Sequence, residues 1–338
     1  MRKINTMKLL SRSVIVAILC LVMTLSCGSE KSLQKIIDTI PSKHLENYSF
    51  DENSSIRERL NSSDQMILDY IRDMDMNPYY LFYDLSEPEI SMIDDYFKLL
   101  PPYFQKVLKE RLIGIYFIEN FYSSGLTDFV LSEEGKIYTI LFLNPEILGS
   151  SISELFTSKD MSCFMRDNDG LSLEINISDD YSGLLYILVH EAAHIVDYVD
   201  RKTPYVHNVM KDLGCIREEN APFTEQFWDS YDIPADFLLI SYNEKLNFYT
   251  QNADKKIPPN DMLSVYQEFQ STPFASLYSY SNWAEDFADY ITLYYLTHYL
   301  GMNYRIGIFD NGKTLFDYEP FANRTVSDRF YKLDDILN

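Results

Sequence analysis

Two histidines and a glutamate near the middle of the chain are the residues best suited to chemistry. They stand in the segment His190-Glu191-Ala192-Ala193-His194. Histidines four residues apart on a helix lie one above the other on the same face, so both imidazoles can bind one metal ion. Glu191 lies beside them, close enough to reach a water molecule on that metal. This HExxH arrangement is typical of a zinc site in which the glutamate acts as a general base.

Apolar residues surround the motif on nearly all sides of the predicted helix. They are Leu184, Leu185, Ile187, Leu188, Val189, Ala192, Ala193, Ile195, Val196 and Val199. A helix that is apolar almost all round is buried, and buried polar groups without partners are costly. A bound metal ion satisfies His190, Glu191 and His194 together. We therefore favour a metal site over two core histidines with ordinary hydrogen bonds.

A catalytic zinc needs a third protein ligand and an open fourth position. The best candidate is Glu285, in the segment Trp283-Ala-Glu-Asp-Phe-Ala-Asp-Tyr290, which predicts a second helix with apolar sides and clustered acidic residues. Glu285 and Asp289 share a face, because they are four residues apart. We place Glu285 on the zinc and expect Asp289 to accept a hydrogen bond from a ligand histidine. The alternative is an acidic cluster favoured by the helix dipole.

Asp200 is a nearer alternative for the third ligand. In one class of HExxH sites the ligand follows six residues after the second histidine, with glycine at the midpoint to turn the chain. Here Asp197 stands in place of that glycine and would continue the helix. We expect Asp197 to orient His190 or His194, with a solvated or capping role as the alternative. The remaining histidines, at positions 44, 207 and 298, are expected to be structural or exposed.

The elements that position these residues can be predicted from apolar spacing and turn signals. The spacing is helical from Asp64 to about Phe121, and Pro101-Pro102 begins the second of two helices there. Residues 125–131 and 136–144 predict two strands, which the turn Ser-Glu-Glu-Gly at 132–135 joins as a hairpin.

The motif helix follows a third predicted strand, 171–177, whose apolar residues alternate. It begins after the capping residues at 178–182 and runs to about Asp200. Residues 204–281 are mostly helical or irregular, the last long helix covers 282–300, and the tail is short strand or loop.

The amino terminus is typical of an export signal. Basic residues precede the apolar run Val14–Met23, which is too short to span a bilayer comfortably. Ser26-Cys27-Gly28 follows and resembles a bacterial lipoprotein cleavage site, although Leu25 stands two rather than three residues before the cysteine. We expect a lipid on Cys27 that anchors the exported chain to a bacterial membrane, in the periplasm or on the cell surface. Ordinary signal cleavage nearby is the alternative.

Composition sets further bounds. The chain has 338 residues, 46% of them hydrophobic, so it can form a sizeable core. Its net charge is −22 and becomes −26 without the first 26 residues, which hold four basic and no acidic side chains. Such a chain repels phosphate backbones, which excludes nucleic acid as a partner. The acidity is explained by solubility, with a preference for basic substrates as the alternative.

Cys163 and Cys215 are left in the exported chain, and the sequence leaves open whether they pair.

The two motifs together resemble gluzincin metallopeptidases, in which a glutamate from a later helix completes the HExxH site. The closest likeness is to the catalytic domain of anthrax lethal factor type enzymes. There the glutamate opens an E-x-F-A-E/D stretch, and a tyrosine seven residues earlier assists catalysis. Glu285-Asp-Phe-Ala-Asp289 fits this pattern, with Tyr278 in the tyrosine position and Tyr280 as the alternative. The resemblance covers the two helices only, so substrate preference does not transfer.

The resemblance implies a zincin-like α+β fold, predominantly helical, with a small sheet, an active-site helix beneath it and a helical second lobe. Within it we expect a signal peptide over 1–26, a lipid-anchored tether with short helices over 27–62, a helical region over 63–122 and the metallopeptidase domain over 123–338.

The expected activity is hydrolysis of a peptide or protein by a water that one Zn²⁺ activates. Glu191 is the expected general base, and Tyr278 the expected donor to the oxyanion. An extended substrate would lie along an edge strand, 136–144 or 171–177. The alternatives are a non-catalytic zinc-binding surface lipoprotein and a hydrolase of other substrates. The intact Glu191 argues against the former, because metal binding alone does not need this base.

Overall fold

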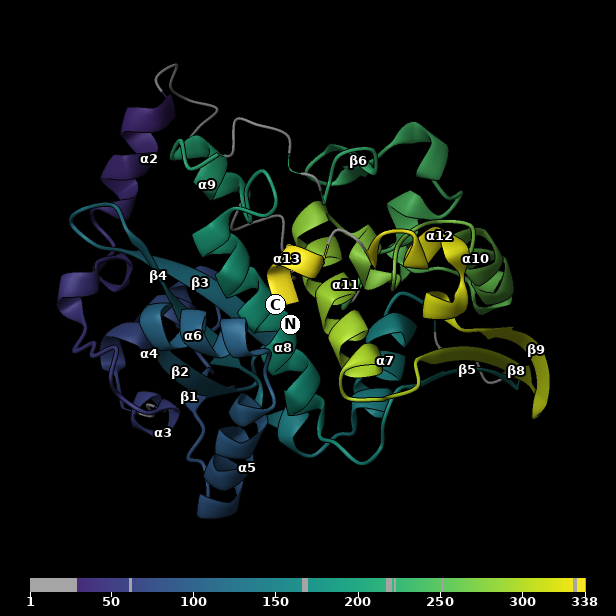
Figure 1. Cartoon of the computed structure of the whole chain (residues 1–338), viewed down its shortest axis with the longest axis horizontal. Helices are drawn as coiled ribbons and strands as arrows, with labels where there is room; N and C mark the ends of the chain where they lie inside the picture. Colours follow the sequence, from purple (N-terminus) through teal and green to yellow (C-terminus); the bar gives the residue numbers. More distant parts are fainter. Residues whose placement is uncertain are drawn as a thin grey trace, which may run out of the picture.

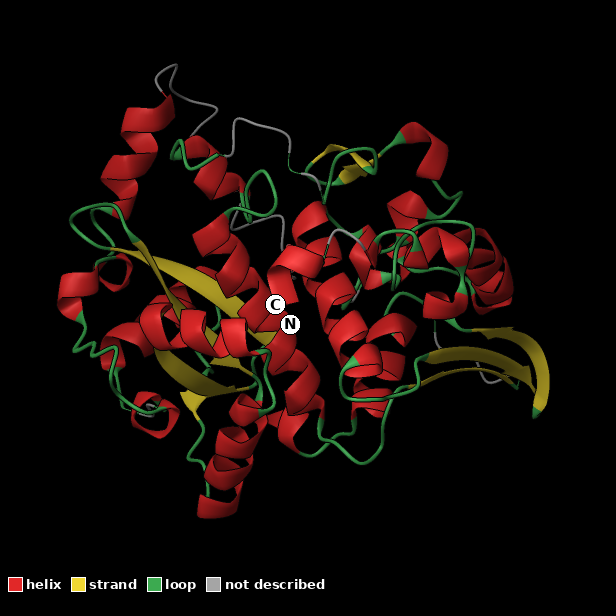
Figure 2. Ribbon diagram, viewed as in Figure 1, coloured by secondary structure: helices red, strands yellow, loops and turns green. Residues whose placement is uncertain are grey.

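The computed structural model describes residues 29–60, 63–165, 170–216, 221, 223–250, 252–330 and 333–337. The predicted signal peptide and Cys27 lie outside these residues, so both stay predictions. The fold is a mixed α+β one with small sheets, as predicted (Figures 1 and 2). No helix within the described ranges is long and apolar enough to cross a membrane.

A four-stranded sheet forms the core of the amino-terminal half. Its strand order is β1 (Leu81–Phe82), β2 (Leu112–Glu119), β4 (Ile137–Leu143) and β3 (Gly125–Leu131). β2 pairs parallel to β4, while the other pairs are antiparallel. The predicted hairpin of β3 and β4 is confirmed, which places β3 at an edge and β4 in the interior of the sheet.

The prediction of helical structure as far as Phe121 is wrong after Arg111. The helix α6 (Pro102–Arg111) ends there, and the next residues form β2. Nearly every residue of β2 is buried, on both faces of the sheet. A strand buried on both faces is a continuous apolar run rather than an alternating one, so its periodicity does not distinguish it from a helix.

Helices cover both faces of this sheet, and β2 contributes to two cores. On one face, Ile113 and Ile118 pack with the helix α4 (Gln65–Asp75). On the other face, Leu112 and Ile115 belong to the main core, which includes α6 and the motif helix α8 (Gly183–Asp200). The motif helix therefore packs against the sheet, as Figure 1 shows.

The segment 27–62 does hold short helices, but the expectation of a tether is wrong for its described part. Leu33 and Ile37, on α2 (Ser29–Ile37), are buried in the main core. Lys43 is 5% exposed, forms an ion pair with Asp128 and donates to the carbonyl of Phe129, so it covers the later part of β3. These contacts make the segment an integral part of the fold.

A second, three-stranded sheet lies in the carboxy-terminal half, in the order β5 (Leu171–Asn176), β8 (Arg305–Asp310), β9 (Lys313–Tyr318). The predicted strand at 171–177 is thus confirmed, at the edge of this sheet. The helix α11 (Trp283–His298) matches the predicted long helix and packs beside α8 (Figure 1). The remaining helices and strands are α3 (Ile56–Arg59), α5 (Glu87–Lys98), α7 (Ile152–Met161), α9 (Asn208–Asp212), β6 (Trp228–Ser230), β7 (Ile233–Pro234), α10 (Met262–Phe269), α12 (Arg324–Ser327) and α13 (Asp334–Leu337), with several one-turn 3₁₀ helices.

A buried ion pair connects Arg329, near the carboxy terminus, to Asp286 in the first turn of α11. Both terminal nitrogens of Arg329 donate to Asp286, at 2.9 and 2.8 Å, and the indole of Trp228 donates to the same carboxylate. Because buried charges must be paired, this contact fixes the first turn of α11 and with it the neighbouring residue 285.

The two cysteines of the described chain are not joined. Cys163 is buried, and burial raises the pKa of its thiol, while Cys215 is half-buried. The disulfide that the sequence left open is therefore not formed in this structure.

Candidate metal centre

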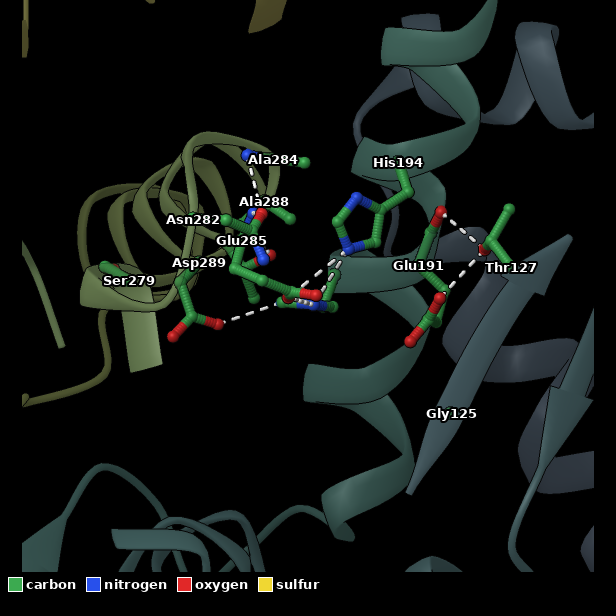
Figure 3. A network of polar contacts seen from close by, with 12 residues as sticks. Gly125, Thr127, Glu191, His194, Ser279, Asn282, Ala284, Glu285, Ala288 and Asp289 are labelled. Carbon is green, nitrogen blue, oxygen red and sulfur yellow. Dashed lines mark hydrogen bonds and ion pairs between the residues drawn. The ribbon is translucent and has the colours of Figure 1, made fainter. Parts of the chain in front are cut away.

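The motif helix is held so that its polar residues face two different neighbours. Its amino-terminal cap is Ser182, whose hydroxyl accepts from the backbone amide of Leu184. Burial of the helix between the sheet and α11 matches the expectation from its apolar sides. In Figure 3, His194 points from α8 toward α11, whereas Glu191 points toward β3.

Three side chains from α8 and α11 meet at one point. Nε2 of His190 lies 3.2 Å from Nε2 of His194 and 3.1 Å from Oε2 of Glu285. Nε2 of His194 lies 3.5 Å from the same carboxylate oxygen. The structure thus brings Glu285, and not Asp200, to the two histidines. Figure 3 shows Glu285 on α11 beside His194.

These separations fit a single tetrahedral metal ion. With metal–ligand bonds of about 2.0–2.2 Å, ligand atoms on a tetrahedral zinc lie roughly 3.3 Å apart. The three distances between the ligand atoms, 3.1, 3.2 and 3.5 Å, lie around this value. The histidine side chains are 5% and 10% exposed and that of Glu285 is 21% exposed, so the group is enclosed on the histidine side and reaches solvent beside Glu285. This buried group of two nitrogens and one carboxylate can hold a metal ion.

Asp289 lies behind His190, on the far side of the ring from the other candidate ligands. Its Oδ1 is 2.9 Å from Nδ1 of His190, and the hydroxyls of Tyr186 and Ser276 also donate to this carboxylate. A hydrogen bond at Nδ1 fixes the tautomer of the ring and turns the lone pair of Nε2 toward a metal. Asp289 is therefore placed to orient a ligand histidine.

Neighbouring charges shift the pKa values of His190 and Glu285. Burial by itself lowers the pKa of His190, but hydrogen bonds to Asp289 and Glu285 outweigh it and raise this pKa to about 10. Burial raises the pKa of Glu285, yet the positive charge of His194 and hydrogen bonds from both histidines hold it well below its ordinary value. Without a metal, the carboxylates of Glu285 and Asp289 therefore favour the protonated, positively charged form of His190. A divalent cation can supply the positive charge that the protonated His190 supplies otherwise. A metal ion and this proton therefore compete for binding to the group.

Glu191 is held by β3 rather than by the metal-binding group. The hydroxyl of Thr127 donates to its Oε2 at 2.8 Å (Figure 3). Its other oxygen lies over Gly125, where a Cβ atom would come within 2.6 Å of Oε1 and 2.8 Å of Ile187. The edge strand thus fixes the direction of this carboxylate, and only glycine leaves room for it.

Asp197 and Asp200 do not reach the metal-binding group. Both oxygens of Asp197 accept from Thr203, from its amide at 2.7 Å and its hydroxyl at 2.6 Å. Nδ1 of His194 has no hydrogen-bond partner among the described residues. The expectation that Asp197 orients a histidine is therefore wrong, because the turn after α8 offers its carboxylate two nearer donors. Asp200 lies in the last turn of α8 and accepts from Tyr103 at 2.7 Å, so it is not part of the metal-binding group.

The two candidate tyrosines differ in their surroundings. The phenol of Tyr280 donates to the carbonyl of Leu238 and accepts from the amide of Ile240, so it serves the packing of the 3₁₀ helix (Tyr278–Tyr280). Tyr278 is half-buried, and its ring centroid lies 6.1 Å from that of His190. Of the two, Tyr278 is the one beside the metal-binding residues.

Sequence reasoning did not identify several residues that support the site. Thr127 and Gly125 lie on β3, and Lys159 lies on α7. These elements reach α8 and α11 through tertiary packing, which local sequence patterns do not reveal. Tyr186 carries a local signal, because it stands four residues before His190 and so shares its face of the helix.

Comparison with protein-family models, with curated proteins and with solved structures found no match for the chain. The interpretation of the site therefore depends on its own geometry.

Proposed function

We propose that the protein is a zinc-dependent peptidase of the gluzincin type. The observation that carries this proposal is the meeting of His190, His194 and Glu285 at tetrahedral ligand separations, with a separately anchored Glu191 next in sequence to a ligand. Two imidazoles and one carboxylate are the protein ligands typical of catalytic zinc, which keeps its fourth position for water. The solvent-facing side of Glu285 supports such an open position.

Each residue then has one task in the reaction. Bound zinc would acidify a water and polarise the substrate carbonyl. Glu191 takes the proton of that water and delivers it to the leaving amine. Thr127 holds the Glu191 carboxylate in one orientation, and Asp289 keeps His190 in the tautomer that binds metal. Tyr278 donates a hydrogen bond to the oxygen on which negative charge develops.

The edge strand β3 is our proposed support for an extended substrate. The interior position of β4 excludes one of the two strands expected from the sequence, and β5 belongs to the other sheet. β3 is at an edge, and its first residues contact Glu191. An extended peptide can add to such an edge through main-chain hydrogen bonds. Because Lys43 covers the later residues of β3, we place the substrate along Gly125 and Leu126, which are half-buried.

Replacing Gly125 by alanine is expected to lower kcat by up to about 100-fold while zinc stays bound. The added methyl group overlaps Oε1 of Glu191 and must push this carboxylate out of line, and the three atoms nearest to it belong to Glu191 and Ile187 rather than to a ligand. Steady-state kinetics together with the zinc content of the purified variant would measure both effects. Gly149→Ala is the matched control, because its Cβ would meet nothing nearer than 4.0 Å. Unchanged kinetics in Gly125→Ala would show that the position of Glu191 does not matter.

The proposal is tested by incubating a mixed peptide library with three preparations of the chain: metal-free, zinc-loaded, and zinc-loaded then treated with a chelator. Mass spectrometry of the products should show new peptide ends with the zinc-loaded protein alone. Zinc uptake without cleavage would favour the alternative of a non-catalytic zinc-binding lipoprotein. Failure to take up zinc would contradict the metal centre itself.

A further inference from the structure

A buried lysine lies behind the metal-binding residues and takes no part in the mechanism above. Lys159, on α7, is 4% exposed. Its Nζ donates to the phenol of Tyr186 at 2.6 Å and lies 3.6 Å from Oδ2 of Asp289. The same ammonium stands 4.4–4.7 Å from the ring centroids of three aromatic residues, Phe156, Tyr186 and Tyr278.

Such a position is costly for a charge unless a partner compensates it. An ammonium removed from water loses the free energy of its hydration, and interactions with aromatic faces compensate only part of this loss. Asp289, which is fully buried, supplies the opposite charge. Loss of Asp289 would therefore leave Lys159 without this opposite charge, and loss of Lys159 would leave Asp289 with His190 and the hydroxyls of Tyr186 and Ser276.

Asp289 connects this lysine to the metal site. Its Oδ2 faces Lys159 and accepts from Ser276, while its Oδ1 faces His190 and accepts from Tyr186. Figure 3 shows Asp289 one turn along α11 from Glu285, so the same helix presents a metal-binding carboxylate and the one that orients His190.

We propose that Lys159 is a positioning residue for the metal centre. Its ammonium holds one oxygen of Asp289, so that the other oxygen stays on Nδ1 of His190 and Nε2 faces the metal. This inference rests on the proposed function only in requiring that the site binds a metal. Without Lys159, Oδ2 of Asp289 loses its cationic partner and keeps the Ser276 hydroxyl, so the carboxylate can rotate and the ring of His190 loses its fixed orientation.

The first experiment compares Lys159→Met with Lys43→Met. Lys43 is a matched control, since it is also buried, also pairs with a carboxylate, Asp128, and also lies over an aromatic ring, Phe129 at 3.9 Å. Both variants are expected to melt at lower temperature than the wild type. Only Lys159→Met should weaken zinc affinity, by about 10-fold, and change the visible absorption bands of the Co²⁺-loaded protein.

A double-mutant cycle then tests whether Lys159 acts through Asp289. Asp289→Asn should weaken zinc affinity by about 10- to 100-fold, and the double variant should bind zinc no more weakly than Asp289→Asn alone. Independent losses that add, or a Lys159→Met protein with the zinc affinity and Co²⁺ spectrum of the wild type, would overturn the inference. A wild-type protein that binds zinc but cleaves no peptide would contradict the proposed function and leave this inference intact. A wild type that binds no metal overturns both.

Discussion

A chain in which glutamine replaces Glu191 is expected to bind zinc like the wild type and to lose about 10²- to 10⁴-fold in kcat. The amide keeps the volume of the side chain and can still accept from the Thr127 hydroxyl, so the local packing is preserved. It cannot take a proton from water at neutral pH. The three residues proposed to bind the metal are untouched, which separates the loss of the base from the loss of the metal.

The measurement is the rate of cleavage of a peptide found in the library experiment, at saturating substrate, with zinc content determined on the same sample. Glu174→Gln makes the same chemical change at an exposed position of β5 and should leave both quantities unchanged. Retained hydrolysis in the Glu191 variant would remove the general base from the mechanism. A zinc-free variant would instead show that Glu191 is needed to form the site.

The parts of the fold that the sequence predicted well carry their own local signals. The helix with His190 and the helix with Glu285 are long, and both are capped by a polar residue, Ser182 and Asn282. The hairpin of β3 and β4 has a turn that ends in glycine, and Gly135 adopts φ +75° there. Periodicity, caps and turn residues act over a few positions, so a single sequence reveals them.

The parts that were mispredicted depend on distant partners. β2 is apolar on both faces because helices cover both faces of its sheet. Arg59 and Lys43 are polar residues that suggest a solvated segment, yet Arg59 is buried against the carbonyls of Leu108 and Leu112 and Lys43 against Asp128. No pattern within the first 62 residues specifies these partners, since they lie about fifty to eighty-five positions away.

The residues of the site also divide into those that local spacing predicts and those that depend on distant partners. The four-residue spacing in each helix was enough to select His190, His194, Glu285 and Asp289, because residues at that spacing share a face. Asp197 fits no such pair, and its nearest donors, on Thr203, come from the turn that follows. The side chains that hold the site from outside, such as Lys159, are specified by the packing of α7 on α8, which no local spacing reveals.

Replacing Glu285 by glutamine is expected to weaken zinc binding by about 100-fold or more and to lower hydrolysis in step with the loss of metal. Structural zinc sites in zinc-finger peptides bind the ion with about 10–16 kcal/mol through four ligands, so weakening one of the three ligands here should cost roughly 3 kcal/mol, which is about a 100-fold loss of affinity. Glutamine preserves the volume and the backbone of α11. What it removes is the negative charge, which in the structure lies within 3.1–3.5 Å of both histidine Nε2 atoms.

Asp200→Asn is the matched control, because Asp200 is the rival third ligand and lies six residues beyond His194. Its carboxylate accepts from Tyr103 at the end of α8, so the variant should bind zinc with unchanged affinity. Competition titration against a chromophoric chelator measures both affinities on the same scale. If Asp200→Asn lost zinc and Glu285→Gln kept it, the third ligand would come from the motif helix itself and the gluzincin assignment would fail. If both variants kept zinc, the two histidines alone would account for binding, and the contact between α8 and α11 would be a matter of packing rather than of metal chemistry.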